Sequence, residues 1–232
     1  MDIASLLGPE PSYLPALRAN MVSTLTGSAT INDLSEAMGN DTDGKLFQAL
    51  RGWADVVFVG GQTVRSEDYS GVEQHSPDSP PAPIAVPTQS LKFEPNSKFL
   101  THFTTAPLFL VPHAALQNPE VSARKGPLEA AGAEVIDAGE GTMQDYLRIL
   151  RERGFQRILC EGGPGMLGQL VHLDAIDQMY LTLDPHLSTG VEKPVATFHG
   201  THSHRRMHLE NIAADTDSTV FLRYSRASEP VD

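Results

Sequence analysis

Runs of apolar residues, separated by polar turns, recur along this chain and predict a β-sheet covered by helices. The clearest run lies between Asp55 and Gly60, where four consecutive residues are apolar. A run that does not alternate is typical of a strand buried on both faces, as in parallel or mixed sheets. Residues 17–25 alternate loosely and then stay apolar or small, which predicts another strand earlier in the chain.

A helix is predicted between these two strands. Residues 41–43 favour helix N-caps, and an apolar stripe at helical spacing follows them. The stripe consists of Leu46, Phe47, Leu50 and Trp53. A polar loop over 28–40 and a loop rich in Pro, Ser and Gly over 70–82 flank this region.

The rest of the chain predicts more strands and helices, ending in an antiparallel hairpin. Strands are expected at 83–86, 107–111, 134–136, 157–160 and 179–183, helices ending near 131 and over 143–153 and 164–172, and the hairpin at 208–212 and 219–224.

The domain organisation is expected to be simple. We find no internal repeat and no shift in composition that marks a domain boundary. Residues 1–16 contain three prolines and no periodicity, so we expect an extended N-terminal arm. The remainder, 17–232, is expected to form a single α/β domain.

Charge and composition narrow the possible functions. The 232 residues carry a net charge of −12, with 29 acids against 17 bases, which disfavours nucleic-acid or anionic-membrane surfaces. The single cysteine excludes an internal disulfide. No apolar run approaches the roughly 20 residues of a membrane span, and the N-terminus does not resemble a signal peptide. We therefore expect a cytoplasmic protein.

The segment 157–168 contains the strongest candidate for chemistry. A predicted strand ends at Glu161, and a glycine-rich turn then leads into a helix. Glycines let backbone N–H groups approach a ligand closely, and a helix N-terminus favours anions, so this turn suits a phosphate or pyrophosphate. A turn that merely joins strand to helix is the plain alternative.

A Rossmann dinucleotide site is a second alternative for the same turn. Residues 163–168 match G-x-G-x-x-G, and Asp184 follows at the end of the next strand, where such sites place an acid on the ribose. Three features weigh against it: the turn lies late in the chain, Pro164 interrupts it, and the helix after it is short.

Four motifs in order, rather than one, resemble a known family. They are 18–23 (RANMVS), 25–27 (LTG), 59–65 (VGGQTVR) and 161–164 (EGGP). Over roughly 17–225 the chain is similar to the riboflavin-biosynthesis pyrimidine reductases, the RibD C-terminal domain family, in its stand-alone actinobacterial type. The zinc deaminase signature found in longer members is missing. The resemblance implies a dihydrofolate-reductase-like fold: a mixed sheet with helices on both faces and a C-terminal antiparallel hairpin.

The resemblance also implies an NADPH-dependent oxidoreductase acting on a small molecule in riboflavin biosynthesis, and a homodimer. Glu161 and Glu67 are implied as catalytic, and substrate binding is implied for Ser35, Arg51 and Glu161. The cofactor positions implied are Val22, Thr63, Ser90, Gly162, Gly163, Pro164, Gly165, Met166, Leu167 and Gly168.

The implied reaction is hydride transfer to a C=N-type carbon, as in 5-amino-6-(5-phosphoribosylamino)uracil reduction, with the cofactor supplying the hydride. Glu161 is the best candidate for orienting the acceptor or delivering a proton. Two departures matter: Thr26 stands where the family has an acid, and no cation follows Arg65 before Glu73. A site short of cations binds phosphate poorly. An unphosphorylated pterin, such as a dihydrofolate-like compound, is therefore a second substrate class, and an NADPH-binding protein without turnover is a third interpretation.

Other residues have plainer interpretations. The histidine-rich stretch 199–208 is expected to be a polar loop rather than a metal site. Cys160 is expected to be a buried apolar side chain. The terminal hairpin and the strand at 179–183 are expected to form a dimer surface.

Overall fold

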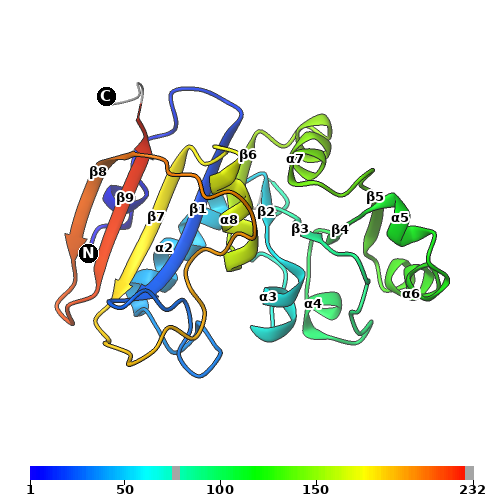
Figure 1. Ribbon diagram of the computed structural model, residues 1–232, viewed down its shortest axis with the longest axis horizontal. Helices are drawn as coiled ribbons and strands as arrows, with labels where there is room; N and C mark the ends of the chain where they lie inside the picture. The colour runs from blue at the N-terminus through cyan, green and yellow to red at the C-terminus, as the bar shows by residue number, and fades with distance from the viewer. Residues whose placement is uncertain (75–78, 228–232) are drawn as a thin grey trace.

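A nine-stranded mixed sheet forms the centre of the protein, in the order β5-β4-β3-β2-β6-β1-β7-β9-β8 (Figure 1). The computed structural model describes residues 1–74 and 79–227. Neighbouring strands run parallel from β5 to β7, whereas β9 is antiparallel to β7 and to β8. The strands are β1 (Ala16–Thr24), β2 (Val56–Phe58), β3 (Ile84–Pro87), β4 (Leu108–Val111), β5 (Glu134–Asp137), β6 (Arg157–Cys160), β7 (Gln178–Asp184), β8 (Met207–Ala214) and β9 (Val220–Arg226).

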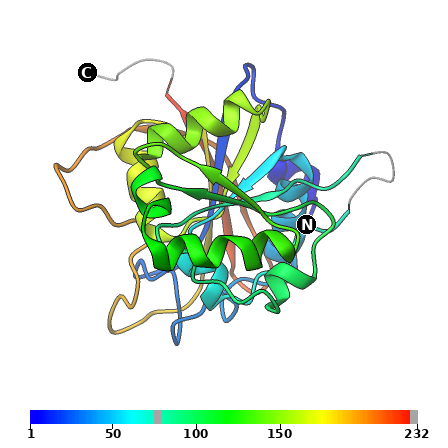
Figure 2. The same cartoon turned by 90° about the vertical axis from the view of Figure 1, so that its right-hand side faces the viewer.

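Helices cover both faces of this sheet. Figure 2, which looks along the sheet from the β5 edge, shows α6 and α7 on opposite sides of it. The helices are α1 (Ile3–Leu7), α2 (Asp41–Trp53), α3 (Gly61–Ser66), α4 (Lys98–Thr101), α5 (His113–Leu116), α6 (Pro119–Ala130), α7 (Met143–Glu152) and α8 (Pro164–His172). None of the described helices is long and apolar enough to cross a membrane.

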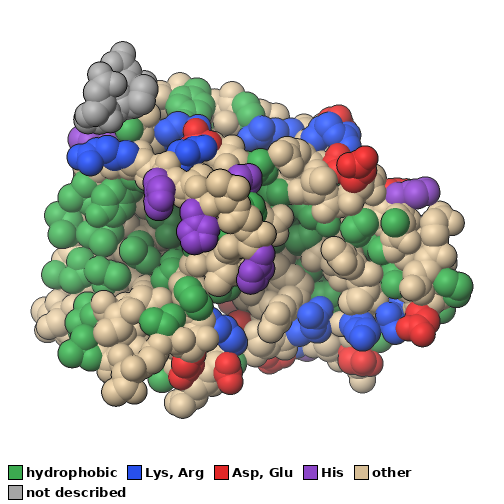
Figure 3. All heavy atoms as spheres, viewed as in Figure 1, with side chains coloured by type: hydrophobic (Ala, Val, Ile, Leu, Met, Phe, Trp, Pro, Cys, Tyr) green, Lys and Arg blue, Asp and Glu red, His purple; other side chains and the backbone are tan. Residues whose placement is uncertain are grey.

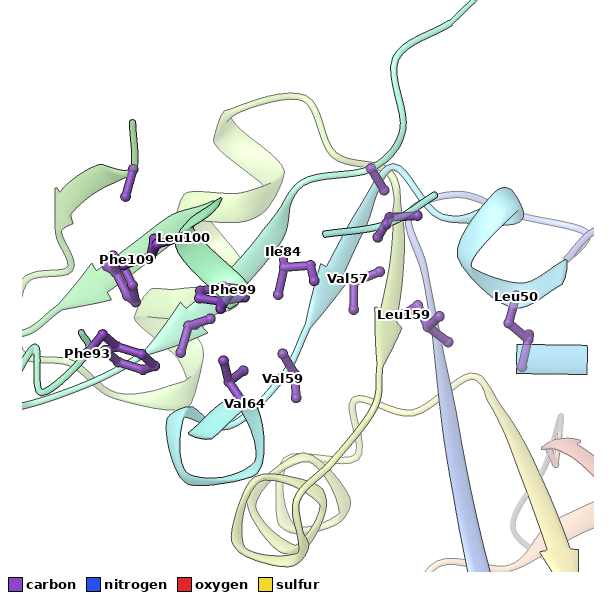
Figure 4. Close-up of a cluster of buried hydrophobic side chains, with 14 of the residues drawn as sticks. Leu50, Val57, Val59, Val64, Ile84, Phe93, Phe99, Leu100, Phe109 and Leu159 are labelled. Carbon is purple, nitrogen blue, oxygen red and sulfur yellow. The ribbon is translucent and has the colours of Figure 1, made fainter. Parts of the chain in front are cut away.

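The uninterrupted apolar strands supply two cores at once, because successive side chains of a strand point to opposite faces. Val57 and Leu159 pack with Leu50 of α2 on one face, as Figure 4 shows. Their neighbours Phe58 and Cys160 are fully buried on the other face, with α7 and α8. The expected mixed sheet with helices on both faces and a terminal hairpin is confirmed.

Short helices account for most differences from the sequence prediction. α3, α4 and α5 have 6, 4 and 4 residues, too few for a helical period to be visible. In the expected N-terminal arm, residues 3–7 are helical; Asp2 caps α1 and Leu6 is buried in the core. The N-cap of α2 is Asn40, one residue before the segment expected to cap it.

Parts of two predicted segments lie outside the described residues. They are positions 75–78 of the loop expected at 70–82, and positions 228–232 of the expected domain.

Candidate active site

The strand register opens a cleft at the carboxyl end of the sheet. β6 ends at Cys160, paired with Ala19 in the middle of β1. β1 continues to Thr24, so its residues 20–24 pair only with β7 on their other side. Ligands bind at this end of open α/β sheets.

The cleft has a volume of about 990 Å³, at the upper end of the range typical of ligand sites. Residues from β1, from α2, from the segments after β1, β2, β3 and β6, and from 141–146 and 192–197 line it. One part of its wall carries glycines and uncharged side chains and another carries most of the acids, so we name two halves of the cleft by their lining residues. The glycine half comprises Gly60, Gly61, Gln62, Thr63, Thr88, Gln89, Gly141, Met143, Tyr146, Gly163, Pro164, Gly165, Met166, Gln169 and Thr197. The acidic half comprises Ser35, Glu36, Met38, Asp43, Gly44, Phe47, Glu67, Tyr69, Glu192 and Lys193, and Glu161 lies between the two.

Two glycine turns meet in the glycine half. The Gly60 N–H donates to the Gly162 carbonyl at 2.8 Å, which ties the turn after β2 to the turn after β6. A Cβ on Gly163 would lie 2.6 Å from Thr63 Oγ1, so a larger residue would require that hydroxyl to move. α8 starts here with Gly163 as N-cap, no capping side chain and Pro164 in its first turn. Pro164 has no N–H, and the Met166 and Leu167 N–H groups both donate to the Gly163 carbonyl at 3.0 Å. The Gly163 and Gly165 N–H groups have no such partner among the described residues and are suited to bind an anion.

Six of the ten predicted cofactor residues line the cleft. These are Val22, Thr63, Gly163, Pro164, Gly165 and Met166.

The other four predicted cofactor positions lie outside the cleft lining. Leu167 is buried in the core, and Gly168 packs against the chain at Thr197, whose carbonyl oxygen would lie 2.0 Å from an added Cβ. Gly162 has φ +77° and lies against Met21. Ser90 binds Arg124 through its carbonyl at 2.8 Å, and its predecessors Thr88 and Gln89 line the cleft instead. A sequence pattern predicts a turn but not which of its residues face outward.

Glu161 is held by a buried network. Arg51 of α2 donates from Nε and Nη2 to its two carboxylate oxygens, at 2.7 and 2.8 Å, and the Tyr69 hydroxyl donates to Oε2 at 3.0 Å. Burial by itself lowers the pKa of Arg51, but the adjacent Glu161 charge and its hydrogen bonds outweigh this, so the pKa is raised. Burial and the Glu161 charge raise the pKa of Tyr69 well above its usual value.

This network changes two of the predicted roles. Both oxygens of Glu161 already accept hydrogen bonds, so the carboxylate can orient a ligand in the cleft, while neither of its oxygens is free of a protein donor. Arg51 does not line the cleft, and its guanidinium is bonded to Glu161 and lies over the ring of Phe47. The direct substrate contact predicted for Arg51 does not fit this geometry.

Ser35 and Glu67 are brought together, although 32 residues separate them. The Ser35 N–H and hydroxyl both donate to the Glu67 carboxylate, the hydroxyl at 2.9 Å. The pair ties the loop after β1 to the end of α3. Both residues line the cleft, which is consistent with their predicted roles near the substrate and the nicotinamide.

Acidic side chains dominate the charge of the cleft. Among the described lining residues Lys193 is the single cation, and it forms an ion pair with Asp33 at 3.3 Å. The five acids are Glu36, Asp43, Glu67, Glu161 and Glu192. The scarcity of cations expected after Arg65 therefore extends to this whole cleft.

The sequence pattern assigns Asp43 only to the helix N-cap segment 41–43 and gives Tyr69 no role of its own, yet both residues line the cleft. A signal for Asp43 was present, because Asp43 and Phe47 are four residues apart and share one face of α2.

The Rossmann alternative is wrong for this chain. Asp184 accepts a hydrogen bond from the Gly39 N–H at 3.0 Å and contacts His186, and it does not line the cleft. The strand order β5-β4-β3-β2-β6-β1-β7-β9-β8 also differs from the 3-2-1-4-5-6 order of that fold. Thr26, also outside the lining, binds Ser188 by a hydroxyl–hydroxyl contact of 2.6 Å.

Cys160 and the histidine-rich stretch 199–208 lie in surroundings that fit their plainer interpretations. Cys160 is fully buried, and burial raises the pKa of its thiol to about 12, as expected of a core side chain. In the part of the chain that the structure describes, no three His, Cys, Asp or Glu side chains gather as a metal site would require. The four histidines of the stretch 199–208 are exposed to solvent.

Comparisons with known proteins agree with this architecture. A pyrimidine reductase-like protein from Corynebacterium diphtheriae has 26% identity and a TM-score of 0.82, with 99% of this chain and 96% of that one covered. The deaminase/5-amino-6-(5-phosphoribosylamino)uracil reductase of Thermotoga maritima has 14% identity and a TM-score of 0.69, over 92% of this chain and 57% of that longer one. Dihydrofolate reductase from Enterococcus faecalis, complexed with NADP(H), has 11% identity and a TM-score of 0.53, over 92% and 98%.

The similarity to dihydrofolate reductase confirms the expected fold class. No curated protein matches the sequence. The model of the RibD C-terminal domain matches residues 15–221, most of the chain. The chain therefore belongs to the RibD C-terminal domain family.

Proposed function

We propose that this protein is an NADPH-dependent reductase that transfers hydride to a C=N-type carbon, as in the reduction of 5-amino-6-(5-phosphoribosylamino)uracil. Family membership, and reductases among the similar solved structures, support an oxidoreductase. The observation that carries the proposal is the pairing of two glycine turns with the uncapped N-terminus of α8 in one cleft.

The residues of the glycine half fit a dinucleotide. The Gly163 and Gly165 N–H groups and the Thr63 hydroxyl would hold its phosphates, and no charged side chain lines this half among the described residues. A bound dihydronicotinamide supplies the hydride. The chain would bind and orient the acceptor through Glu161 and the Ser35–Glu67 pair.

NADPH oxidation, followed at 340 nm with 5-amino-6-(5-phosphoribosylamino)uracil as acceptor, tests the proposal. We expect saturable oxidation that requires the acceptor. A chain that fails to bind NADPH in a calorimetric titration would refute the proposal. A strong preference for NADH would refute the cofactor assignment.

The acidic half of the cleft favours a second candidate, an unphosphorylated acceptor such as a dihydrofolate-like pterin. Phosphate needs arginine forks or clustered N–H groups, and this half offers five acids, counting Glu161, against Lys193. Dihydrofolate in the same assay separates the two candidates. NADPH binding with no oxidation by either acceptor would support a binding protein without turnover.

We also propose a homodimer formed through the open face of the terminal strands. On this face Leu209 pairs with Tyr224 and Ile212 with Leu222, and Leu209 and Ile212 are 41% and 62% exposed. Figure 3 shows apolar side chains gathered over this edge of the sheet. Contiguous exposed apolar surface of this kind often marks a protein interface. Ile212→Lys should convert the dimer to a monomer in size-exclusion chromatography with light scattering.

A further inference from the structure

The proposed reaction needs a proton as well as a hydride, and the cleft acids differ in whether they can supply one. Three of the five already accept several hydrogen bonds: Glu161 from Arg51 and Tyr69, Glu67 from Ser35, and Glu192 from residues 30, 32 and 33. For Glu192 these hydrogen bonds, first of all those from the backbone of Asp33 and Asn32, lower the pKa of the carboxyl group.

The two remaining acids are Glu36 and Asp43, and they lie in different environments. Glu36 is exposed to solvent, whereas Asp43 is partly buried in the first turn of α2. Asp43 Oδ1 accepts a hydrogen bond from the buried Thr182 hydroxyl at 2.5 Å, which fixes the orientation of the carboxyl group. Among the described residues no donor is hydrogen-bonded to Oδ2.

The space around Oδ2 is kept by a glycine. A Cβ on Gly39 would lie 2.7 Å from this oxygen, so a side chain at position 39 would displace the carboxyl group. The Gly39 N–H is already bonded to Asp184 and is not available to Asp43. The free oxygen therefore belongs to a carboxyl group that is anchored on one side and lines the cleft.

Protonation of this group is also favoured. Burial raises the pKa of Asp43, the Thr182 hydrogen bond opposes that shift, and the negative charge of Asp184 adds to it. Other charged groups near this end of α2 are Asp41 and Lys45 on the helix itself, His186 beside Asp184, and Asp215 and Asp217 in the β8–β9 turn, which bind Thr42 and Asn40.

We propose, resting on the reductase function above, that Asp43 binds the imine nitrogen of the acceptor and delivers the proton that accompanies hydride transfer. The acceptor carbon gains the hydride, and the π electrons of the C=N bond move to nitrogen. That nitrogen takes the proton from the Asp43 carboxyl group, which becomes a carboxylate and regains its proton from water. The acceptor is reduced to a C–N single bond, and the dihydronicotinamide is oxidised.

The plain alternative is that Asp43 only stabilises α2, because an acid in the first turn of a helix interacts favourably with the positive end of the helix dipole. Asp41 occupies that first turn as well, is exposed, and does not line the cleft. Asp41→Asn is therefore a matched control for Asp43→Asn.

The experiment compares the full chain with both variants and with Asp43→Glu. Turnover with NADPH is measured from pH 5 to 9 with dihydrofolate and with 5-amino-6-(5-phosphoribosylamino)uracil. We expect Asp43→Asn to lose about 100-fold in turnover, the typical size of a general-acid effect, and Asp43→Glu to recover part of it. The wild-type rate should fall as pH rises and Asp43 loses its proton, Asp41→Asn should follow the wild type, and Asp43→Asn should lack this fall.

Calorimetric binding of NADPH and of each acceptor separates the possible failures. NADPH affinity within about twofold of wild type is expected in every variant, because Asp43 lies in the acidic half and Asp41 lies outside the cleft lining. Loss of NADPH binding by the wild type would refute the proposed function. Normal NADPH binding with equal turnover and equal pH profiles in wild type and Asp43→Asn would overturn the role of Asp43 alone. If neither acceptor turns over, acceptor binding decides the role of Asp43. An acceptor affinity that is the same in Asp43→Asn as in wild type, or a wild type that binds no acceptor, would also overturn that role.

Discussion

The two halves of the cleft are built from different materials. The glycine half consists mostly of backbone: two glycine turns joined by the Gly60–Gly162 hydrogen bond and a helix start without a side-chain cap. The acidic half consists of side chains, which arrive from the loop after β1, from α2 and from the end of α3. Glu161 joins the halves, since its backbone belongs to the glycine turn and its carboxylate to the Arg51 network.

The difference suits two roles, cofactor binding in the glycine half and acceptor recognition in the acidic half. A backbone cradle can hold the phosphates of any dinucleotide with little dependence on side chains. An acceptor site made of side chains can diverge, because exchanging a charge changes which ligand binds and leaves the fold in place. Each experiment below changes one half, or the junction, and measures what happens to the other.

The largest effect is expected at the junction. Arg51→Ala leaves the Glu161 carboxylate, whose side chain is 2% exposed, without its buried partner. Breaking a buried pair in this way costs about 3–5 kcal/mol of unfolding free energy. Urea unfolding followed by circular dichroism measures the change. A loss below about 1 kcal/mol, as for an exposed pair, would show that the junction does not depend on this network.

A side chain added to the glycine half should weaken the binding of NADPH and leave the acidic half unchanged. A Cβ on Gly165 meets the protein no closer than 3.8 Å, at Thr197, so Gly165→Ala should fold normally and intrude on the bound dinucleotide. We expect about a tenfold loss of NADPH affinity, equivalent to 1.4 kcal/mol, by titration calorimetry.

Gly44→Ala is the matched control in the other half. A Cβ there has no neighbour within 4 Å, and alanine inside a helix is favoured over glycine by about 0.5–1 kcal/mol. NADPH affinity should remain at the wild-type value while stability rises. Equal losses of NADPH affinity in Gly165→Ala and Gly44→Ala would remove the distinction between the halves.

A cation added to the acidic half should favour a phosphorylated acceptor. Glu36→Lys changes the net charge from −12 to −10, because one acid becomes one base. A charge pair near the surface is worth about 1 kcal/mol, so the ratio of kcat/KM for 5-amino-6-(5-phosphoribosylamino)uracil over dihydrofolate should rise about fivefold, less at high salt. Glu94→Lys makes the same change outside the cleft lining and should leave the ratio unchanged.

The smallest effect concerns stability and pH. Burial raises the pKa of Asp43 above its ordinary 3.8, so the folded chain holds this proton more tightly than the unfolded chain. The contribution to stability is therefore present below pH 3.8 and is lost as pH rises through the higher pKa of the folded state. Asp43→Asn should lack this loss and gain stability relative to wild type between pH 4 and pH 7, measured by urea unfolding. A lower stability of the variant at pH 7 would favour a helix-stabilising role.

The glycine half was the part of the site that sequence could predict. Its signals are local: glycines, a strand before them and a helix after them within twelve residues, 157–168. The same signals could not separate Gly165, which lines the cleft, from Gly168, which packs against Thr197. Which glycine faces the cleft depends on the position of a loop nearly 30 residues further along the chain.

The acidic half was only partly predictable, because it depends on contacts between distant residues. Nothing in the sequence near Arg51 shows that its guanidinium meets a carboxylate 110 residues later. Asp43 illustrates the same limit, since its orientation is set by Thr182 on a strand that follows 139 residues on. The strands themselves were predicted well, because an unbroken apolar run is a local signal of burial on two faces.

A crystal structure with NADPH bound tests the central claim most directly, through the position of the pyrophosphate. The account predicts that the pyrophosphate lies against the backbone N–H groups of Gly163 and Gly165 and the Thr63 hydroxyl, with the nicotinamide beside Glu161 and facing the acidic half. A pyrophosphate bound at Lys193 in the acidic half, with the glycine turns free of ligand, would contradict it.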